Sequence, residues 1–290
     1  MGGTAHIVVV GGTEAMLDRA VALADRCEAR WSRFLPTSDV SRLNVARGAT
    51  VDVDPLTVTL IEAMTEAVTI TDGDFAPTLL PWLIAAGYGA SVTAPDLVTE
   101  LPQDSVAGGD IRAVVINGLS VRLPPHVTVD AGGIGKGLAA DLVVAALIDD
   151  GAAGALAEIS GDVVVAGDAP DGVAWRLAVE DPFRPDAIRG LVRMASGALV
   201  TSSQRKRRFT TERGERHHLI DPRTGDSVVT DVQTVSVIAG SGARAEALAK
   251  SGFLRPVRAF LDWMPHVGAA ALIIDGDGVA HASANWADYT

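Results

Sequence analysis

The chain has 290 residues, of which 48% are hydrophobic and 21% are charged, a balance that favours a folded globular protein over a disordered one. Its formal net charge of -12 argues against a nucleic-acid binder, because affinity for phosphate backbones comes mainly from clustered Lys and Arg. The single cysteine, Cys27, excludes an intramolecular disulfide. We expect Cys27 to pack on the apolar face of a helix rather than to act as a nucleophile.

The first ten residues contain no basic leader, no apolar segment of signal-peptide length and no cleavage site. No uninterrupted apolar run reaches the roughly 18 residues that are needed to span a bilayer. We therefore expect a cytoplasmic protein with no membrane partner, unless a leader has been removed.

The first half of the chain is expected to contain both helices and short strands. Apolar periodicity and turn residues predict, in order, a strand at 7–10, a helix at 13–31, a polar loop at 37–44, a helix at 56–71, a loop-rich excursion at 85–112 and strands at 113–116 and 120–123. The last two are joined by Asn117-Gly118, a pair typical of a tight hairpin.

The second half is richer in strands. We predict strands at 127–130, 155–159, 163–166, 176–180, 191–194, 199–201, 232–238 and 271–275, and helices at 138–149, 243–254 and 257–263. Strands and helices do not alternate strictly, so the fold class is expected to be α+β, with mostly antiparallel or mixed sheets and packed helices. With no long linker or repeat, residues 1–290 are expected to form one domain.

A glycine-rich turn at 131–137 separates a predicted strand from a predicted helix. Backbone N–H groups at a helix start can bind a phosphate, and glycine lets the ligand approach closely. The P-loop pattern is not met, because Gly137 stands where Ser or Thr is needed, and the glycine spacing differs from the dinucleotide fingerprint. Two interpretations stay open here, a phosphate site and a flexible turn with an exposed Lys136.

Several motifs, taken in order and with their spacing, resemble the ApbE family. They are Met1-Gly2-Gly3-Thr4, the segment 31–44 with its Ser-Arg-Leu-Asn end, Gly73-Asp74-Phe75-Ala76-Pro77-Thr78, Asp130-Ala131-Gly132-Gly133-Ile134-Gly135-Lys136-Gly137, Ser160-Gly161-Asp162, Thr201-Ser202-Ser203 and His217-His218-Leu219-Ile220-Asp221-Pro222-Arg223-Thr224-Gly225. The resemblance extends to about Leu254. It is carried most specifically by the central glycine element and the His-x-x-Asp-Pro segment.

The resemblance implies an FAD:protein FMN transferase, which binds FAD and a divalent cation, usually magnesium. Such an enzyme transfers FMN to a threonine hydroxyl of an acceptor protein and releases AMP. By the same resemblance His218 is the candidate catalytic base, and Phe34 stands where the family commonly has Tyr. The implied cofactor-binding residues are Met1, Phe34, Asp74, Phe75, Ala76, Asp130, Lys136, Thr201, His218 and Ile220.

Some of these positions also have a purely structural interpretation. Asp221, which precedes a proline, is expected to cap a turn, and His217 is expected to be a solvated strand residue. The basic run at 205–208 is interpreted as a solvated loop or strand edge, although it could also steer acidic FAD or a partner.

The sequence departs from the family pattern in three places. Ala76 replaces an Asp and Ser203 replaces a Gly. The third departure concerns the metal site, to which Gly133 would offer its main-chain carbonyl. On the helix at 243–254, Glu246 and Lys250 stand where the family has a metal-binding Asp and Thr.

Three outcomes are open for Lys250, which cannot bind a metal while it is protonated. It could turn away and leave a weakened magnesium site, take the place of the metal, or pair with Glu246 across one helical turn. The expected function is FMN transfer. The alternatives are a degenerate protein that binds FAD without transferring FMN, and a pyrophosphatase that cleaves FAD.

Overall fold

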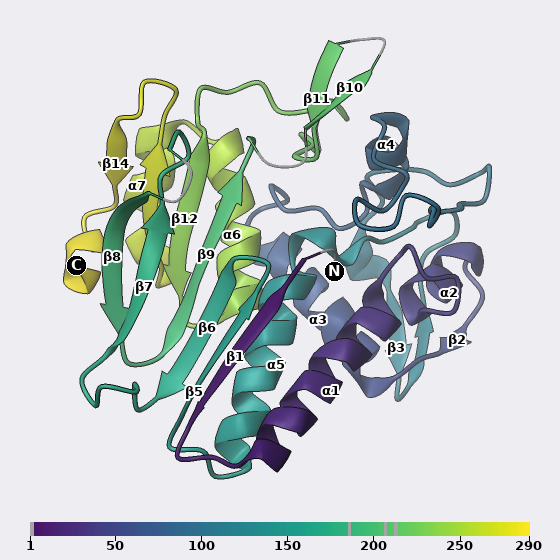
Figure 1. Ribbon diagram of the computed structural model, residues 1–290. Coiled ribbons are helices and arrows are strands. Elements are labelled where there is room, and N and C mark those ends of the chain that lie inside the picture. The colour runs from purple at the N-terminus through teal and green to yellow at the C-terminus, as the bar shows by residue number, and fades with distance from the viewer. Residues whose placement is uncertain (1–2, 185–186, 206–207, 212–213) are drawn as a thin grey trace. The chain divides into compact units, whose positions relative to one another are not determined.

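The computed structural model describes residues 3–184, 187–205, 208–211 and 214–290 (Figure 1). Contacts within the described chain divide it into two compact units. The first consists of residues 25–135 and 208–228, and the second of residues 3–24, 136–205 and 229–290. The single domain inferred from the sequence stays a prediction.

The second unit is built on a seven-stranded sheet in the order β1-β5-β6-β9-β12-β13-β14, and all neighbouring strands are antiparallel. Its strands are β1 (Ala5–Val10), β5 (Gly154–Ile159), β6 (Asp162–Gly167), β9 (Gly197–Ser203), β12 (Thr234–Ala239), β13 (Ala270–Ile274) and β14 (Ala280–Ala282). The expected α+β class with antiparallel sheets is confirmed. Strand β14 was not predicted.

The two faces of this sheet have different coverings (Figure 1). A hairpin of β7 (Trp175–Glu180) and β8 (Ile188–Met194) shares an apolar core with residues of β6, β9, β12 and β13. Helix α6 (Gly242–Leu254) packs against β9 and β12. Side chains alternate along β12, so Ile238 belongs to the hairpin core while Val235 lies under Gly252 of α6. The remaining elements of this part of the chain are α5 (Gly135–Asp149), α7 (Val257–Trp263), η3 (Met264–Val267) and η4 (Trp286–Tyr289).

The first unit is mainly helical, with short strands. Helix α1 (Glu14–Trp31) starts in the second unit and ends in the first. The other elements are α2 (Asp39–Val45), β2 (Val51–Asp52), α3 (Pro55–Ile70), α4 (Leu80–Ala85), η1 (Ile111–Ala113), β3 (Val115–Asn117), β4 (Ser120–Arg122), η2 (Ala131–Gly133), β10 (Arg208–Thr211) and β11 (Gly214–His217). The predicted Asn117-Gly118 hairpin is confirmed as β3–β4, with Gly118 at φ 61°. Strand β10 was not predicted, whereas β11 contains His217, which was expected to be a strand residue.

The polar loop predicted at 37–44 is wrong, because most of it forms α2. The hydroxyl of Ser38 accepts a hydrogen bond from the N–H of Ser41 at 3.1 Å and so caps the helix. Val40 and Leu43 of α2 are buried. A serine cap followed by two spaced apolar residues was therefore the available signal for a helix.

The strand predicted at 127–130 is also wrong. Val127 makes only an isolated bridge to Val106. The backbone of Val129 instead bonds a side chain: its N–H donates to Oδ1 of Asn44 at 2.7 Å, and its carbonyl accepts from Nδ2 at 2.9 Å. The amide of Asn44 thus satisfies both backbone groups that a neighbouring strand would otherwise pair.

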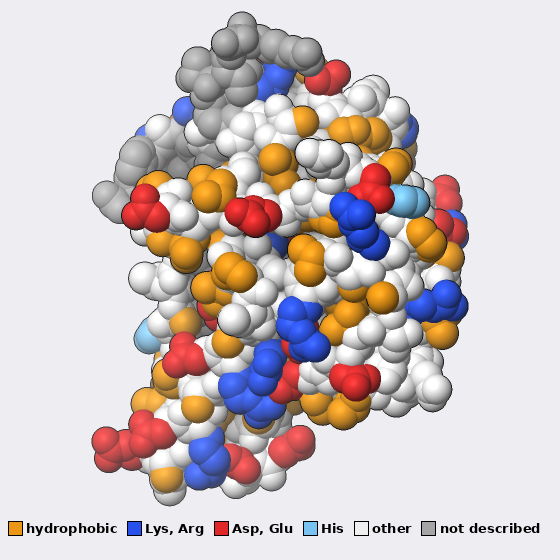
Figure 2. All heavy atoms as spheres, turned by 90° about the vertical axis from the view of Figure 1, so that its right-hand side faces the viewer, with side chains coloured by type: hydrophobic (Ala, Val, Ile, Leu, Met, Phe, Trp, Pro, Cys, Tyr) orange, Lys and Arg blue, Asp and Glu red, His pale blue; other side chains and the backbone are white. Residues whose placement is uncertain are grey.

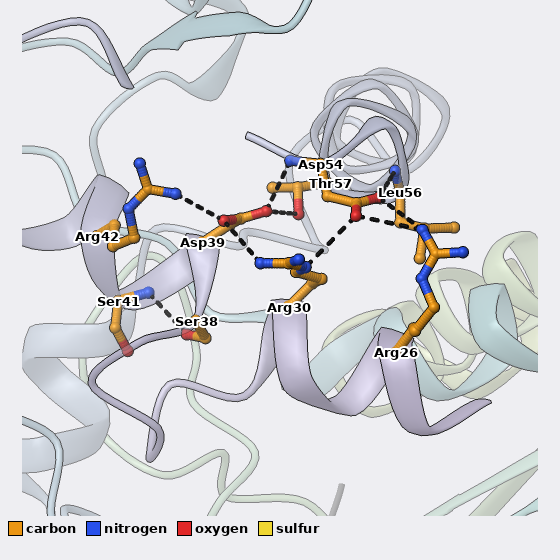
Figure 3. A network of polar contacts seen from close by, with 9 residues as sticks. All are labelled: Arg26, Arg30, Ser38, Asp39, Ser41, Arg42, Asp54, Leu56 and Thr57. Atoms are coloured by element: carbon orange, nitrogen blue, oxygen red, sulfur yellow. Dashed lines mark hydrogen bonds and ion pairs between the residues drawn. The ribbon is translucent and has the colours of Figure 1, made fainter. Parts of the chain in front are cut away.

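A buried carboxylate, Asp39, ties α2 to the start of α3 (Figure 3). Its Oδ2 accepts hydrogen bonds from the N–H of Asp54 at 2.8 Å and from the hydroxyl of Thr57 at 2.9 Å. Its Oδ1 accepts from Arg42 at 2.9 Å and lies 3.9 Å from the guanidinium of Arg30 on α1. Both carboxylate oxygens are therefore engaged although the side chain has no exposure to solvent.

No helix among the described residues is long and apolar enough to cross a membrane. Figure 2 shows that basic and acidic side chains adjoin one another on the face in view and are interspersed with apolar ones. That face carries no broad patch of a single sign.

We expect Asp39→Ala to lower the free energy of unfolding by about 2–4 kcal/mol, because the buried hydroxyl of Thr57 and the half-buried N–H of Asp54 lose their acceptor. The measurement is denaturant-induced unfolding followed by circular dichroism. Asp96→Ala, at an exposed position of the same unit, is the control and should change little. Equal unfolding midpoints for the two variants would contradict this role of Asp39.

Candidate functional site

Lys136, in the first turn of α5, meets two carboxylates in the second unit. Its ammonium donates a hydrogen bond to Oδ2 of Asp162 at the start of β6, and lies 2.9 Å from Oε1 of Glu246 on α6. The side chains of Lys136, Asp162 and Glu246 are 14%, 3% and 0% exposed. The expectation of an exposed lysine, made by the interpretation of this segment as a flexible turn, is therefore wrong.

Glu246 is a fully buried carboxylate whose two oxygens are both engaged. Its Oε2 accepts a hydrogen bond from the N–H of Gly137 at 2.9 Å, while Oε1 forms the ion pair with Lys136 without hydrogen-bond geometry. Burial by itself would raise the pKa of Glu246, but the charges of Lys136 and Lys250 and the Gly137 N–H bring that pKa below its usual value. Glu246 is thus held as a carboxylate.

Lys250 lies one turn after Glu246 on α6 and points into the same cluster. Its ammonium donates to Oγ of Ser202 at 2.9 Å and to the main-chain carbonyl of Glu246 at 3.3 Å. Ser202 is on β9. The preceding residue, Thr201, was the predicted cofactor-binding residue, but its side chain lies on the other face of the strand, where its hydroxyl is hydrogen-bonded to that of Ser236 at 2.8 Å. The structure therefore brings Ser202, not Thr201, to the lysine.

The beginnings of α5 and α6 approach each other closely at two glycines. A Cβ on Gly137 would overlap the carbonyl of Gly242, and a Cβ on Gly242 would overlap the backbone of Gly137. Asp141 of α5 accepts the N–H groups of Gly242 at 2.6 Å and Ala243 at 2.9 Å. Burial raises the pKa of Asp141 to about 6, against the lowering effect of these two bonds.

Carboxylates of the chain bond some of the N–H groups at and near the glycine-rich turn, and its interpretation as a phosphate site stays a prediction. Carboxylates accept the N–H of Gly137 at the start of α5 and two N–H groups at the start of α6. Gly137 allows the starts of α5 and α6 to approach each other closely. The sequence had suggested instead that glycine here lets a ligand approach. The contact of Lys136 with FAD stays a prediction.

In the first unit, an arginine that the sequence analysis did not single out organises two predicted cofactor residues. The Arg33 side chain is 3% exposed, and its Nε lies 3.4 Å from Oδ1 of Asp130. Its guanidinium donates to the Thr99 hydroxyl at 2.6 Å and to the Tyr88 carbonyl at 2.7 Å. It also lies 4.2 Å from the ring centre of Phe34 and 4.9 Å from that of Tyr88. Arg33 thus fixes Asp130 and the half-buried Phe34 together.

The segment that contains Asp74, Phe75 and Ala76 begins directly after α3. Phe75 is 4% exposed, and its N–H donates to the hydroxyl of Thr71 at 3.1 Å. Asp74 and Ala76 are half-buried. Phe75 is a core residue of this unit, and the cofactor role of all three positions stays a prediction.

The His-x-x-Asp-Pro segment follows β11. The expectation that His217 is solvated is wrong: it is 8% exposed, its Nε2 bonds the Val228 carbonyl at 3.0 Å, and burial lowers its pKa. His218 is half-buried and Ile220 is buried. The turn role of Asp221 is confirmed, since its carboxylate accepts the N–H of Arg223 at 2.9 Å and pairs with that guanidinium.

The remaining positions singled out in the sequence are Met1, the basic run, Gly133 and Cys27. Met1 lies outside the described residues, as do two members of the basic run at 205–208. Gly133 lies in η2. Cys27 is confirmed as a packed residue of α1, and burial raises the pKa of its thiol to about 12.

Comparisons with known proteins extend the resemblance. A sequence model of the ApbE family matches residues 1–273. The FAD:protein FMN transferase of Treponema pallidum is 30% identical, with 94% of this chain and 81% of the relative aligned. That of Rhodobacter capsulatus is also 30% identical, over 76% of this chain, but the chain spans only 42% of that relative's length.

Solved structures agree with the fold. The ApbE protein of Thermotoga maritima has a TM-score of 0.83 at 25% identity, covering 98% of this chain and 95% of that one. The flavinyl transferase ApbE of Pseudomonas stutzeri has a TM-score of 0.81 at 24% identity, covering 99% and 93%. The chain belongs to the ApbE family.

Glu246 and Lys250, the positions where the resemblance to the family implies metal ligands, do not fit a divalent cation. Both oxygens of Glu246 are engaged, and the ammonium of Lys250 has no lone pair to offer. A divalent ion about 4 Å from that ammonium would meet a repulsion of about 8 kcal/mol at an effective dielectric near 20. Across the described ranges, no three His, Cys, Asp or Glu side chains are grouped to hold a metal.

We expect Gly137→Ala to destabilise the second unit, because the added Cβ overlaps the backbone of Gly242 and one of the two helices has to move. The loss should be about 1–3 kcal/mol in denaturant-induced unfolding. Gly240→Ala is the matched control, since a Cβ there meets nothing within 4 Å. If the unfolding midpoint of Gly137→Ala equals that of Gly240→Ala, the close approach of the two helices tolerates a side chain and the expectation is wrong.

Proposed function

We propose that this protein is an FAD:protein FMN transferase that binds FAD and transfers its FMN part to an acceptor protein. The observation that supports this most strongly is the family match over residues 1–273, together with relatives of that name which align with most of the chain. The central glycine element with Lys136 and the His218 segment both retain the family pattern.

The transfer is a displacement at phosphorus. The hydroxyl oxygen of an acceptor threonine forms a bond to the phosphorus of the FMN part, and the bond from that phosphorus to the bridging oxygen breaks. AMP leaves with that oxygen, and the hydroxyl proton passes to a base. Because charge on the diphosphate oxygens opposes an approaching nucleophile, the reaction depends on positioning and charge neutralisation.

Lys136 and Lys250 are two described cations of the second unit that are suited to that purpose. We propose that Lys136 contacts the diphosphate from the first turn of α5, and that Asp162 and Glu246 fix the direction of its ammonium. A lysine held in this way loses little side-chain freedom when it binds.

On the acceptor side we propose His218 as the base that receives the threonine proton. A neutral imidazole can accept a proton in the physiological pH range, which suits this role. His217 is unsuited to this role, because its Nε2 is bonded to the Val228 carbonyl and its ring is buried. We further propose that Phe34 and Asp130, held by Arg33, contribute to binding FAD.

A cytoplasmic location is part of the proposal and is consistent with a chain that has one cysteine. No role for nucleic acid is proposed, given the net charge of -12.

Incubation with FAD and an acceptor protein that carries a reactive threonine should add one FMN to the acceptor and release one AMP. Mass spectrometry of the acceptor and chromatography of the nucleotides measure the two products. An acceptor with that threonine replaced by valine is the control, because it lacks the hydroxyl. FMN and AMP released without acceptor labelling would indicate a pyrophosphatase, and FAD bound but unchanged would indicate a binding protein.

His218→Ala should reduce the rate of acceptor labelling by about a hundredfold or more, since general-base catalysis contributes about that factor. FAD affinity should stay within a few fold, because the proposed role lies on the acceptor side. His266→Ala, at an exposed position in η3, is the control. Labelling by the His218 variant at the wild-type rate would remove His218 from the mechanism.

A further inference from the structure

The buried cluster of the second unit contains two ammonium groups as well as its carboxylates. Lys136 pairs with Asp162 and Glu246, and the Lys250 ammonium bonds Ser202 Oγ at 2.9 Å and the main-chain carbonyl of Glu246 at 3.3 Å. The formal charges of these two lysines and two carboxylates add to zero. The acidic group is therefore balanced by the chain's own cations.

The place of Lys250 differs from that of a lysine in an ordinary surface pair. The Ser202 hydroxyl and the Glu246 carbonyl, to which it donates hydrogen bonds, both lie inside the cluster. The side chain of Lys250 is half-buried against β9. Burial raises the pKa of Asp162 to about 6, and the charge of Lys250 acts against that rise; together with Lys136 it also helps to hold the pKa of Glu246 below its usual value against the effect of burial. Lys250 occupies the interior of an acidic site, where a bound cation would be expected.

Without Lys250, the remaining charges of Lys136, Asp162 and Glu246 would add to -1. Such a site would repel the two negative charges of a diphosphate unless a metal ion entered it. With Lys250 present these four groups together are neutral and offer additional N–H donors, while the nearby carboxylate of Asp141 is bonded to two N–H groups of α6. An anion can then approach without a metal ion.

We propose that Lys250 replaces the divalent cation of the family, so that this protein binds the diphosphate of FAD without a divalent metal. The inference rests on the proposed function, because it concerns the same ligand. It selects one of the three outcomes that the sequence left open, the one in which a lysine takes the place of the metal.

The first test is FAD binding by the wild-type protein, measured by equilibrium dialysis with either EDTA or millimolar magnesium. We expect dissociation constants that agree within about twofold. A loss of tenfold or more in EDTA would overturn the inference while leaving the proposed function intact. Absence of FAD binding under both conditions would overturn the proposed function, and this inference with it.

The second test uses variants of the same position in EDTA. Lys250→Met keeps the length of the side chain and removes its charge, and should weaken FAD binding by about 10- to 100-fold. Lys250→Arg keeps the charge and should stay close to wild type. Arg258→Met removes a charge from an exposed position on α7 and serves as the matched control. Unchanged affinity in Lys250→Met would overturn the inference.

The third test asks whether metal dependence can be restored. The double substitution Glu246→Asp with Lys250→Thr removes the ammonium and supplies two oxygen ligands, which a hard cation prefers. Magnesium alone should then raise the melting temperature of the double variant and leave that of the wild type unchanged. A rise of similar size in the wild type would show that a metal binds beside Lys250, and would overturn the inference.

Discussion

The carboxylate of Glu246 has no exposure to solvent, and a buried charge is costly unless it is paired and hydrogen-bonded. Its compensation comes from Lys136 and from the N–H of Gly137, both at the start of α5. The same lysine bonds Asp162 where β6 begins. One buried carboxylate on α6 is therefore compensated by groups at the start of α5, and the same lysine links α5 to the start of β6. This arrangement also places both lysines of the candidate site.

Much of the fold could be predicted because the central strands are short apolar runs bounded by turn residues, and the helices follow an apolar period. The prediction failed where a side chain, and not a neighbouring strand or helical turn, forms the hydrogen bonds of the backbone. Val129 looks like part of a strand, but its N–H and carbonyl pair with the amide of Asn44, far away in the sequence. Helix α2 was missed because Ser38 and Asp39 are residue types typical of loops. Here Ser38 caps α2, and Asp39 bonds the backbone at the start of α3. Neither partnership is visible in local periodicity.

The candidate site divides in a similar way. Motif order identified Lys136, Glu246 and Lys250, because each stands at a family position. It did not identify Ser202 as the partner of Lys250, or Asp141 as the acceptor of two N–H groups of α6. Asp141 did leave a signal, since it is an acidic residue within the mainly apolar stretch 138–148 of α5, one turn after Gly137. Arg33 left a weaker signal in the sequence. Its burial beside the rings of Phe34 and Tyr88 depends on contacts that form only in the folded chain.

The polar network around Asp39 also bears on the order in which the chain folds. Its members lie between Arg26 and Thr57, so closing it requires only short loops and little loss of chain entropy. The cluster around Glu246 instead joins residues near 136, 162 and 246, and it cannot form until α6 has been synthesised. Contacts that are close in sequence form faster than distant ones. We therefore expect the Asp39 region to gain structure early during translation, while the charged centre of the second unit closes among the last events.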